Sequence, residues 1–145
     1  MNHDDFSALV DRARRDHPIW FDLPRDEPPD EQVLVDAEAE LGARLPEDFR
    51  WFLRQFGGGD FGFATIYSAD PGSDLSLLRN QPGDTEGLVA FSEDGTGSLF
   101  VFPVEDDACR DRVLVWDHEL GDVRPTDYGT FLEFVARVAL QADDG

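Results

Sequence analysis

The chain contains no lysine, so arginine alone supplies its basic side chains. Its 12 arginines stand against 32 aspartates and glutamates, which gives a formal net charge of -20. Nucleic acids and anionic membranes are bound through clustered cationic side chains, and a field of this sign repels both. Basic proteins are favoured as partners, because opposite charges accelerate association. High acidity also serves solubility in many proteins, and composition alone does not separate these two interpretations.

Cysteine is almost absent as well. Cys109 is the only one, which excludes an internal disulfide bond and indicates a reducing compartment. The first residues lack the apolar region of a secretory signal, and no apolar run approaches the ~20 residues that a membrane span requires. We therefore expect a cytoplasmic protein. Its 145 residues fit one domain over 1–145, and 12 phenylalanines supply a core.

Four segments carry the apolar spacing of amphipathic helices. Their apolar stripes are Phe6, Leu9, Val10 and Ala13; Leu34, Ala37 and Leu41; Phe49, Phe52, Leu53 and Phe56; and Phe131, Phe134, Val135 and Val138. Asp30 is expected to cap the second helix, and Thr130 with Glu133 has the spacing of a capping box. Residues 17–31, rich in proline and acids, are expected to form a loop that its apolar residues 19–21 attach to the core.

The middle of the chain changes to the period of two that is typical of strands. Residues 61–67 are predicted to form one strand with Phe61 and Phe63 on the same face. Further strands are predicted at residues 88–91, 98–104 and 112–116. The order of helices, then strands, then a helix predicts an α+β fold, with a mainly antiparallel sheet packed by helices on one side. Neither an internal repeat nor a second domain is indicated.

No motif for catalysis, a metal or a cofactor is present. The glycines 57–59 follow a helix, whereas a phosphate-binding loop follows a strand and opens a helix. One cysteine and three histidines show no zinc-ligand spacing. A Cys109–His118 nucleophile pair has no supporting signature, and nearby acids disfavour the thiolate. Carboxylate pairs such as Asp117 and Glu119 carry little meaning in so acidic a chain.

Two residues stand out from the general pattern. Glu38 lies beside an apolar stripe, so we expect it to be partly buried and to accept hydrogen bonds from backbone N–H groups at the start of the next helix. Trp116 ends a predicted strand just before Asp117. It is either a core residue or a half-exposed residue that holds a partner.

The segment LVDAEAELGARLPEDFRWFLRQFGG, residues 34–58, resembles the signature of the SUKH superfamily, which includes the Smi/Knr-type cell-wall assembly regulators. The family's pattern falls on Leu34, Ala37, Glu38, Leu41, Gly42, Leu45, Pro46, Phe49, Gly57 and Gly58. One departure is Phe56, where the family often has asparagine. The resemblance covers about residues 30–140 and leaves 1–29 as an N-terminal helix and an acidic, proline-rich loop.

This resemblance implies a SUKH-like α+β fold and, for bacterial members, an immunity protein that neutralises a polymorphic toxin by direct contact. Such toxins are very often nucleases, and a basic nuclease as partner would account for the acidic charge. The family brings no catalytic residue and no cofactor. The alternative is a regulatory or scaffold binding protein like the eukaryotic members. A neighbouring toxin gene would discriminate between the two; an enzyme is the third and least supported interpretation.

Two acidic loops are the predicted partner-binding residues. They comprise Glu105, Asp106, Asp107 and Asp111 in one loop, and Asp117, Glu119 and Asp122 after Trp116 in the other. Because the flanking strands are expected to be neighbours, both loops are predicted to share one negative surface beside Trp116. The acids would steer a basic partner and the aromatic ring would hold it. A rival surface is the acidic loop of Asp22, Asp26, Glu27 and Asp30.

Overall fold

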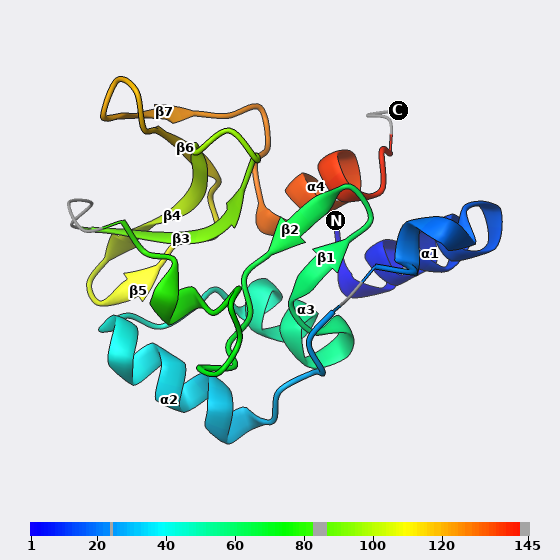
Figure 1. The fold of residues 1–145 in the computed structure, drawn as a ribbon, viewed down its shortest axis with the longest axis horizontal. Helices are drawn as coiled ribbons and strands as arrows, with labels where there is room; N and C mark the ends of the chain where they lie inside the picture. The colour runs from blue at the N-terminus through cyan, green and yellow to red at the C-terminus, as the bar shows by residue number, and fades with distance from the viewer. Residues whose placement is uncertain (24, 83–86, 143–145) are drawn as a thin grey trace.

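The computed structural model describes residues 1–23, 25–82 and 87–142, and its elements are labelled in Figure 1. The α-helices are α1 (His3–Asp16), α2 (Glu31–Leu41), α3 (Glu47–Phe56) and α4 (Phe131–Phe134), the last continued by a π-helical segment over Val135–Ala139. Short 3-10 helices are η1 (Pro18–Phe21) and η2 (Leu77–Arg79). The strands are β1 (Gly59–Phe61), β2 (Ala64–Ile66), β3 (Leu88–Glu93), β4 (Leu99–Glu105), β5 (Ala108–Cys109), β6 (Leu114–Asp117) and β7 (Asp122–Pro125).

These strands form one antiparallel sheet in the order β1-β2-β3-β4-β6-β7, with β5 paired to the end of β4. Neighbours in the sheet are neighbours in the chain or nearly so, as short hairpin connections require. Helices α3 and α4 lie against one side of the sheet (Figure 1). The predicted α+β fold with a mainly antiparallel sheet is confirmed.

A cluster of phenylalanine rings joins this helical layer to the sheet. The ring of Phe49 on α3 lies 5.5 Å from Phe102 on β4, 6.0 Å from Phe91 on β3 and 4.9 Å from Phe131 on α4. All four residues are fully buried. Edge-to-face geometry at these distances adds to the burial of each ring, which contributes about 1.5–3 kcal/mol by itself.

The single strand predicted over residues 61–67 is wrong. The chain turns back at Gly62 and Phe63, so that Phe61 pairs with Ala64 in a tight hairpin. Gly62 has φ +57°, and a Cβ there would lie 2.2 Å from the carbonyl oxygen of Ala139, which accepts a hydrogen bond from Phe63 N–H. Phe63 is therefore 59 % exposed, although Phe61 is buried. The end of the C-terminal helix, distant in sequence, fixes this turn.

Two smaller expectations also need correction. The loop of residues 17–31 contains the 3-10 helix η1, and Ile19 within it is 74 % exposed, so only Trp20 and Phe21 pack against the core. Asp122, which was assigned to an acidic loop, instead begins β7, and this strand pairs with β6 along its whole length.

The corner between α2 and α3 depends on Glu38, as the sequence predicted. Gly42 ends α2 in the left-handed conformation (φ +75°), and the Glu38 carboxylate accepts a hydrogen bond of 2.7 Å from Leu45 N–H, just before α3. Arg50 on α3 lies 3.5 Å from the same carboxylate oxygen and also pairs with Glu31 on α2. A mostly buried carboxylate thus satisfies a backbone donor that the helix start leaves without a partner.

Glu38→Ala is expected to lower the free energy of unfolding by about 1–3 kcal/mol, because Leu45 N–H loses its acceptor and Arg50 loses a nearby carboxylate. The exposed Glu40 on the same helix is the matched control, and Glu40→Ala should change stability by less than about 0.5 kcal/mol. Urea denaturation of both variants measures the difference. Equal stability of the two variants would contradict a structural role for Glu38.

Candidate functional site

The face of the sheet that points away from α3 and α4 is also apolar. Along β4, Phe100 and Phe102 contact Phe134 and Phe131 of the last helix, with ring centroids 4.6 and 6.1 Å apart. Because side chains alternate along a strand, Leu99 and the other odd-numbered residues of β4 point to the opposite face. Near Leu99 this outer face therefore carries aliphatic side chains that neither α3 nor α4 covers, whereas Val101, farther along β4, is fully buried.

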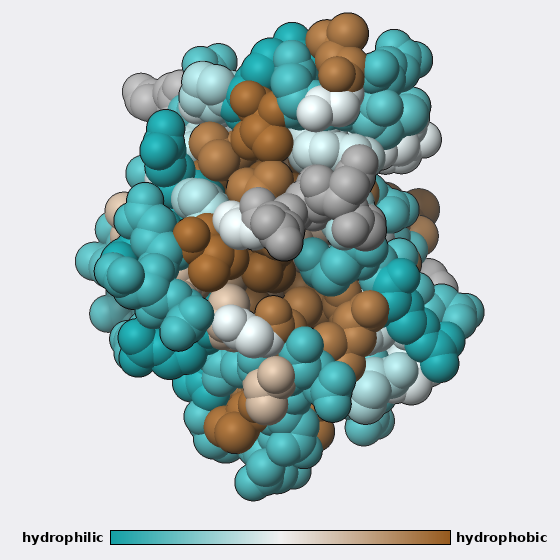
Figure 2. Space-filling view, turned by 90° about the vertical axis from the view of Figure 1, so that its left-hand side faces the viewer, coloured by the Kyte–Doolittle hydropathy of each residue, from teal (hydrophilic) through white to brown (hydrophobic). Residues whose placement is uncertain are grey.

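A row of apolar side chains crosses this outer face near one end of the sheet. The register pairs Leu99 of β4 with Trp116 of β6, and Trp116 with Val123 of β7, and directly opposed residues share a face. Leu99 and Trp116 are half-buried, Val123 is 38 % exposed, and Leu120 in the following turn is 67 % exposed. Figure 2, which views the side where these strands lie, shows hydrophobic residues gathered through the middle of that face between polar flanks.

Acidic residues border this row at the β6–β7 turn. Asp117 builds the turn, because its carboxylate accepts hydrogen bonds from the backbone N–H groups of Leu120 and Glu119, at 3.2 and 2.9 Å. These bonds, with the nearby Arg124 guanidinium, lower the pKa of Asp117 below its ordinary value. Asp122 lies directly opposite Asp117, and Arg124 bridges the two at 3.7 and 2.7 Å. The exposed Glu119 has no ion pair among the residues that the structure describes.

The β3–β4 turn lies beside the β6–β7 turn and adds another acid. The ring of His118 packs against Gly97, where a Cβ would lie 2.9 Å from His118 Cε1. Asp94 in the β3–β4 turn accepts hydrogen bonds from Thr96, and these bonds lower its pKa despite some burial. The carboxylates of Asp94 and Asp117 are therefore ionised at neutral pH near the apolar row around Trp116.

The expectation that both predicted acidic loops share one surface is wrong. Leu99, opposite Trp116, begins β4, whereas Glu105 ends it, so the two loops lie at opposite ends of the strand, about 20 Å apart. Asp106 and Asp107 form a tight turn with φ of 52° and 61°, and Arg44 N–H donates to the Asp107 carbonyl. The sequence indicated that the strands are neighbours, but the register decides which ends meet.

Asp111, assigned to the same predicted loop, has a structural contact instead. Its carboxylate accepts a hydrogen bond of 2.8 Å from Phe131 N–H, at the start of α4. The neighbouring Thr130 accepts from Glu133 N–H, and the Glu133 carboxylate accepts from Gly129 N–H. Burial raises the pKa of Asp111, although the bond from Phe131 lowers it, and the charges of Asp48 and Glu133 raise it further.

The rival acidic loop is also partly engaged within the fold. Asp30 caps α2 by accepting from Val33 N–H, and the Asp26 carboxylate accepts from the Ser73 hydroxyl at 2.6 Å. Asp22 and Glu27 remain exposed. This loop thus presents fewer available carboxylates than its composition suggests.

The residues that might support catalysis are dispersed. Cys109 is buried and pairs with Val104 near the end of β4, whereas His118 lies against Gly97, just before β4 begins. The two residues therefore form no pair. Burial, and then the charge of Glu38, raise the pKa of the Cys109 thiol to about 12, so the thiolate is scarce at neutral pH. Within residues 1–23, 25–82 and 87–142, no group of three or more histidine, cysteine or acidic side chains is placed to hold a metal ion.

The glycines 57–59 have a packing role. A Cβ at Gly57, where φ is +77°, would lie 2.1 Å from the carbonyl oxygen of Asp26, and one at Gly58 would lie 2.6 Å from Ser68 Cα. The glycines therefore let two loops pass close to the end of α3. They do not open a helix as a phosphate-binding loop does.

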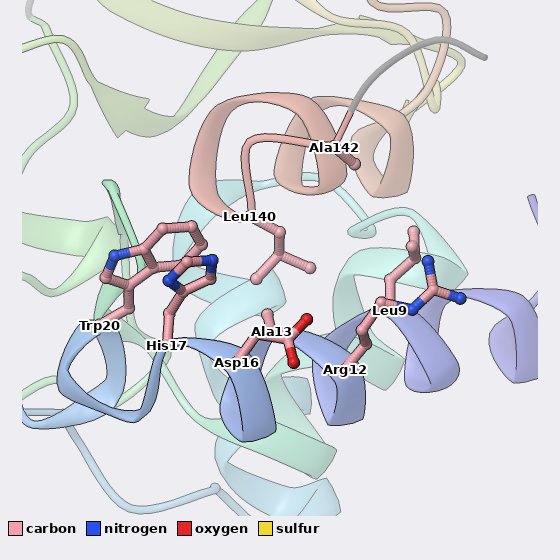
Figure 3. A pocket seen from close by; sticks show the side chains of 8 residues that line it. All are labelled: Leu9, Arg12, Ala13, Asp16, His17, Trp20, Leu140 and Ala142. Carbon is pink, nitrogen blue, oxygen red and sulfur yellow. The ribbon is translucent and has the colours of Figure 1, made fainter.

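A pocket that sequence reasoning missed lies between α1, η1 and the C-terminal segment (Figure 3). Its volume is about 380 Å³, and the side chain of Leu140 points into it. His17 and Trp20 stack at one end, with ring centroids 3.9 Å apart, and Arg12 and Asp16 lie along the side formed by α1. No local sequence signal exists for this pocket, because its walls come from the first 20 and the last residues of the chain.

Comparison with protein families finds a match over most of the chain. The model of the SUKH_6 family, described as SMI1-KNR4 cell-wall, matches residues 31–135, which is most of the chain. The matched range contains the Glu38 corner, the sheet and Trp116, whereas α1, η1 and the pocket of Figure 3 lie outside it. No curated protein and no solved structure matches the chain. In the part of the chain that the structure describes, no helix is long and apolar enough to cross a membrane.

The contact of Asp111 with α4 makes a prediction about charge. Asp111→Asn keeps an acceptor for Phe131 N–H but removes a carboxylate whose raised pKa disfavours its ionised form in the folded protein, so stability at pH 7 should rise. Since the wild type gains stability as the pH falls through that raised pKa, the advantage of asparagine should shrink on acidification. Asp111→Ala should lose about 1 kcal/mol, because the donor is left unpaired.

Denaturant titrations of both variants at several pH values measure these differences. An Asp111→Asn protein less stable than the wild type at pH 7 would show that the ionised carboxylate is favourable there.

Proposed function

Because the chain belongs to the SUKH superfamily, we propose that it is an immunity protein that binds a basic toxin and neutralises it by direct contact. This family is not a known enzyme family, and its members suggest protein–protein interaction in general. The observation that carries the proposal is the outer face of the sheet, where the half-exposed row of Leu99, Trp116 and Val123 is bordered by ionised carboxylates.

The chemistry of this face fits a protein partner. A partly exposed tryptophan amid aliphatic side chains is typical of the residues that contribute most to binding energy in protein interfaces. The exposed Leu120, in the turn between β6 and β7, adds a further apolar side chain at the end of these strands. Water leaves such a surface readily, since few of its side chains form hydrogen bonds with solvent.

The charge around this face selects a basic partner. Asp94, Glu119 and Asp122 border the apolar row, and the whole chain carries a net charge of -20. A nuclease toxin presents a positively charged cleft for its substrate, so an acidic protein competes for the same field. We therefore propose a nuclease as the toxin class.

The second candidate function is that of a regulatory binding protein. The matching family is described by a cell-wall term and not by a toxin, which favours this alternative. Both candidates use the outer face for protein binding. They differ in whether the partner is harmful to the cell.

Co-expression tests the immunity proposal directly. A toxin domain encoded by the neighbouring gene should arrest growth when expressed alone, and the wild-type chain should restore growth. The purified chain should have no nuclease or other hydrolase activity of its own. Failure to restore growth, or to bind that domain in solution, would exclude immunity and leave the regulatory function.

Binding kinetics test which surface is used. Glu119→Gln with Asp122→Asn should slow association several-fold at low salt and weaken its salt dependence, because steering charges are removed. Asp106→Asn with Asp107→Asn is the matched control, since it removes the same charge at the other end of β4 and asparagine tolerates positive φ. A larger effect of the control pair would place the interface at the β4–β5 turn instead.

The dissociation rate of the complex tests the apolar contacts that the outer face is proposed to make with its partner. Trp116→Ala should weaken binding by about 2 kcal/mol, or roughly thirtyfold, mainly through faster dissociation. Leu120→Ser provides a second variant, because a residue 67 % exposed contributes little to folding. Unchanged dissociation for a folded Trp116→Ala and for Leu120→Ser would rule out the outer face as the interface.

A further inference from the structure

In the part of the chain that the structure describes, Arg14 and Arg25 lack ion pairs although carboxylates are abundant. Among residues 1–23, 25–82 and 87–142, the arginines with ion pairs are Arg50, Arg54, Arg79, Arg110 and Arg124. Neither Arg14 nor Arg25 has a carboxylate within 4.0 Å in that part of the chain. Both line the same open pocket, which has a volume of about 540 Å³.

Aromatic rings hold both guanidinium groups. The Arg14 guanidinium lies 5.4 Å from the ring centre of Phe21 and 5.7 Å from that of Phe56, and the Arg25 guanidinium lies 5.8 Å from that of Phe61. Contacts at these distances stabilise a cation while leaving its N–H donors free to bind another group. The two side chains are thus oriented without being neutralised.

The backbone that carries Arg25 is fixed from the other side. Arg25 forms an isolated antiparallel bridge with Gly59, and Asp26 N–H donates to the Gly58 carbonyl at 2.9 Å. The close approach of Gly57 to Asp26 completes this contact. The pocket is therefore built from α1, the loop that follows η1, and the end of α3, and backbone contacts join that loop to the residues after α3.

Asp22, Asp26 and Glu27 line the pocket as well, but their carboxylates form no ion pair with its two arginines. The Asp26 carboxylate accepts from the Ser73 hydroxyl, and the exposed Asp22 and Glu27 form no ion pair with either arginine. Burial lowers the pKa of Arg25, and so does the charge of Arg14, which means that the two cations repel each other at short range. An anion placed between them would offset this repulsion.

We propose that the pocket between Arg14 and Arg25 binds a small oxyanion group, either a carboxylate or a phosphate. Both groups accept paired hydrogen bonds from the planar fork of a guanidinium, and two arginines on either side of one pocket supply donors from two directions. The net charge of the chain opposes an anion from a distance, but at physiological salt charges more than about 8 Å away are largely screened. The three carboxylates of the lining oppose an anion at closer range, so the two guanidinium groups must outweigh them through direct contact.

This site lies apart from the outer face of the sheet. Helix α1 and the β6–β7 hairpin are on opposite sides of the molecule (Figure 1), so an anion and a protein partner can bind together. Arg14 and Arg25 also precede the family-matched residues 31–135. The proposal therefore does not depend on the proposed function.

Isothermal titration calorimetry with inorganic phosphate, N-acetylglycine and N-acetylglycinamide tests the site at constant ionic strength. The wild type should bind phosphate or N-acetylglycine saturably at one site, and the amide, which lacks the carboxylate, should not bind. Arg14→Gln and Arg25→Gln should each weaken binding about tenfold, because one charge-assisted pair is lost. Arg15→Gln, the matched control, removes a neighbouring charge of α1 that does not line the pocket and should bind as the wild type does.

The tighter of the two anions identifies the group that the site prefers. NMR of the wild type gives a measurement that does not depend on how the variants fold: the side-chain Nε–H signals of Arg14 and Arg25 should shift on titration, whereas that of Arg15 should not. Absence of saturable binding by both anions would overturn the proposal. So would an equal loss of binding in Arg15→Gln, which would indicate general attraction to the arginines of α1.

Discussion

The contact of Phe49 with Phe91, Phe102 and Phe131 is the constraint on which the rest of the molecule depends. These buried rings hold the helical layer against one face of a sheet that is apolar on both faces. Once α3 and α4 occupy that face, the row containing Trp116 remains on the other one, only half-buried. An uncovered apolar sheet face is costly in water, and it is retained where a partner covers it.

Charge and register together decide how that face can be used. The β6–β7 turn brings carboxylates to the apolar row, while the antiparallel register carries the Glu105–Asp107 turn to the far end of β4. Several acids that look available in the sequence hold the fold together instead: Glu38 fixes the α2–α3 corner, and Asp111 supports the start of α4. High acidity in this chain therefore serves local structure, in addition to the recognition that we propose.

The sequence predicted those features that depend on residues close together in the chain. The helical stripe around Phe49, the cap at Thr130 and the buried acceptor at Glu38 follow from spacing within a few turns of chain, and the structure contains each of them. The hairpin at Gly62 was missed because its cause is the distant Ala139 carbonyl. The prediction that the two acidic loops share one surface was wrong for a similar reason. Strand register depends on pairing between distant segments, which the spacing of residues does not define. The residues near Trp116 could be named from the sequence, but not their separation from those near Glu105.

The central claim is that a basic protein covers the outer face beside Trp116. Hydrogen–deuterium exchange tests this claim without any substitution. It is measured on the chain alone and on the chain bound to the toxin domain that the neighbouring gene encodes. The account predicts slower exchange over β6, the following turn and β7, residues 114–125, with little change over residues 105–109. Protection confined to the β4–β5 turn or to the acidic loop before α2, with residues 114–125 unaffected, would contradict it.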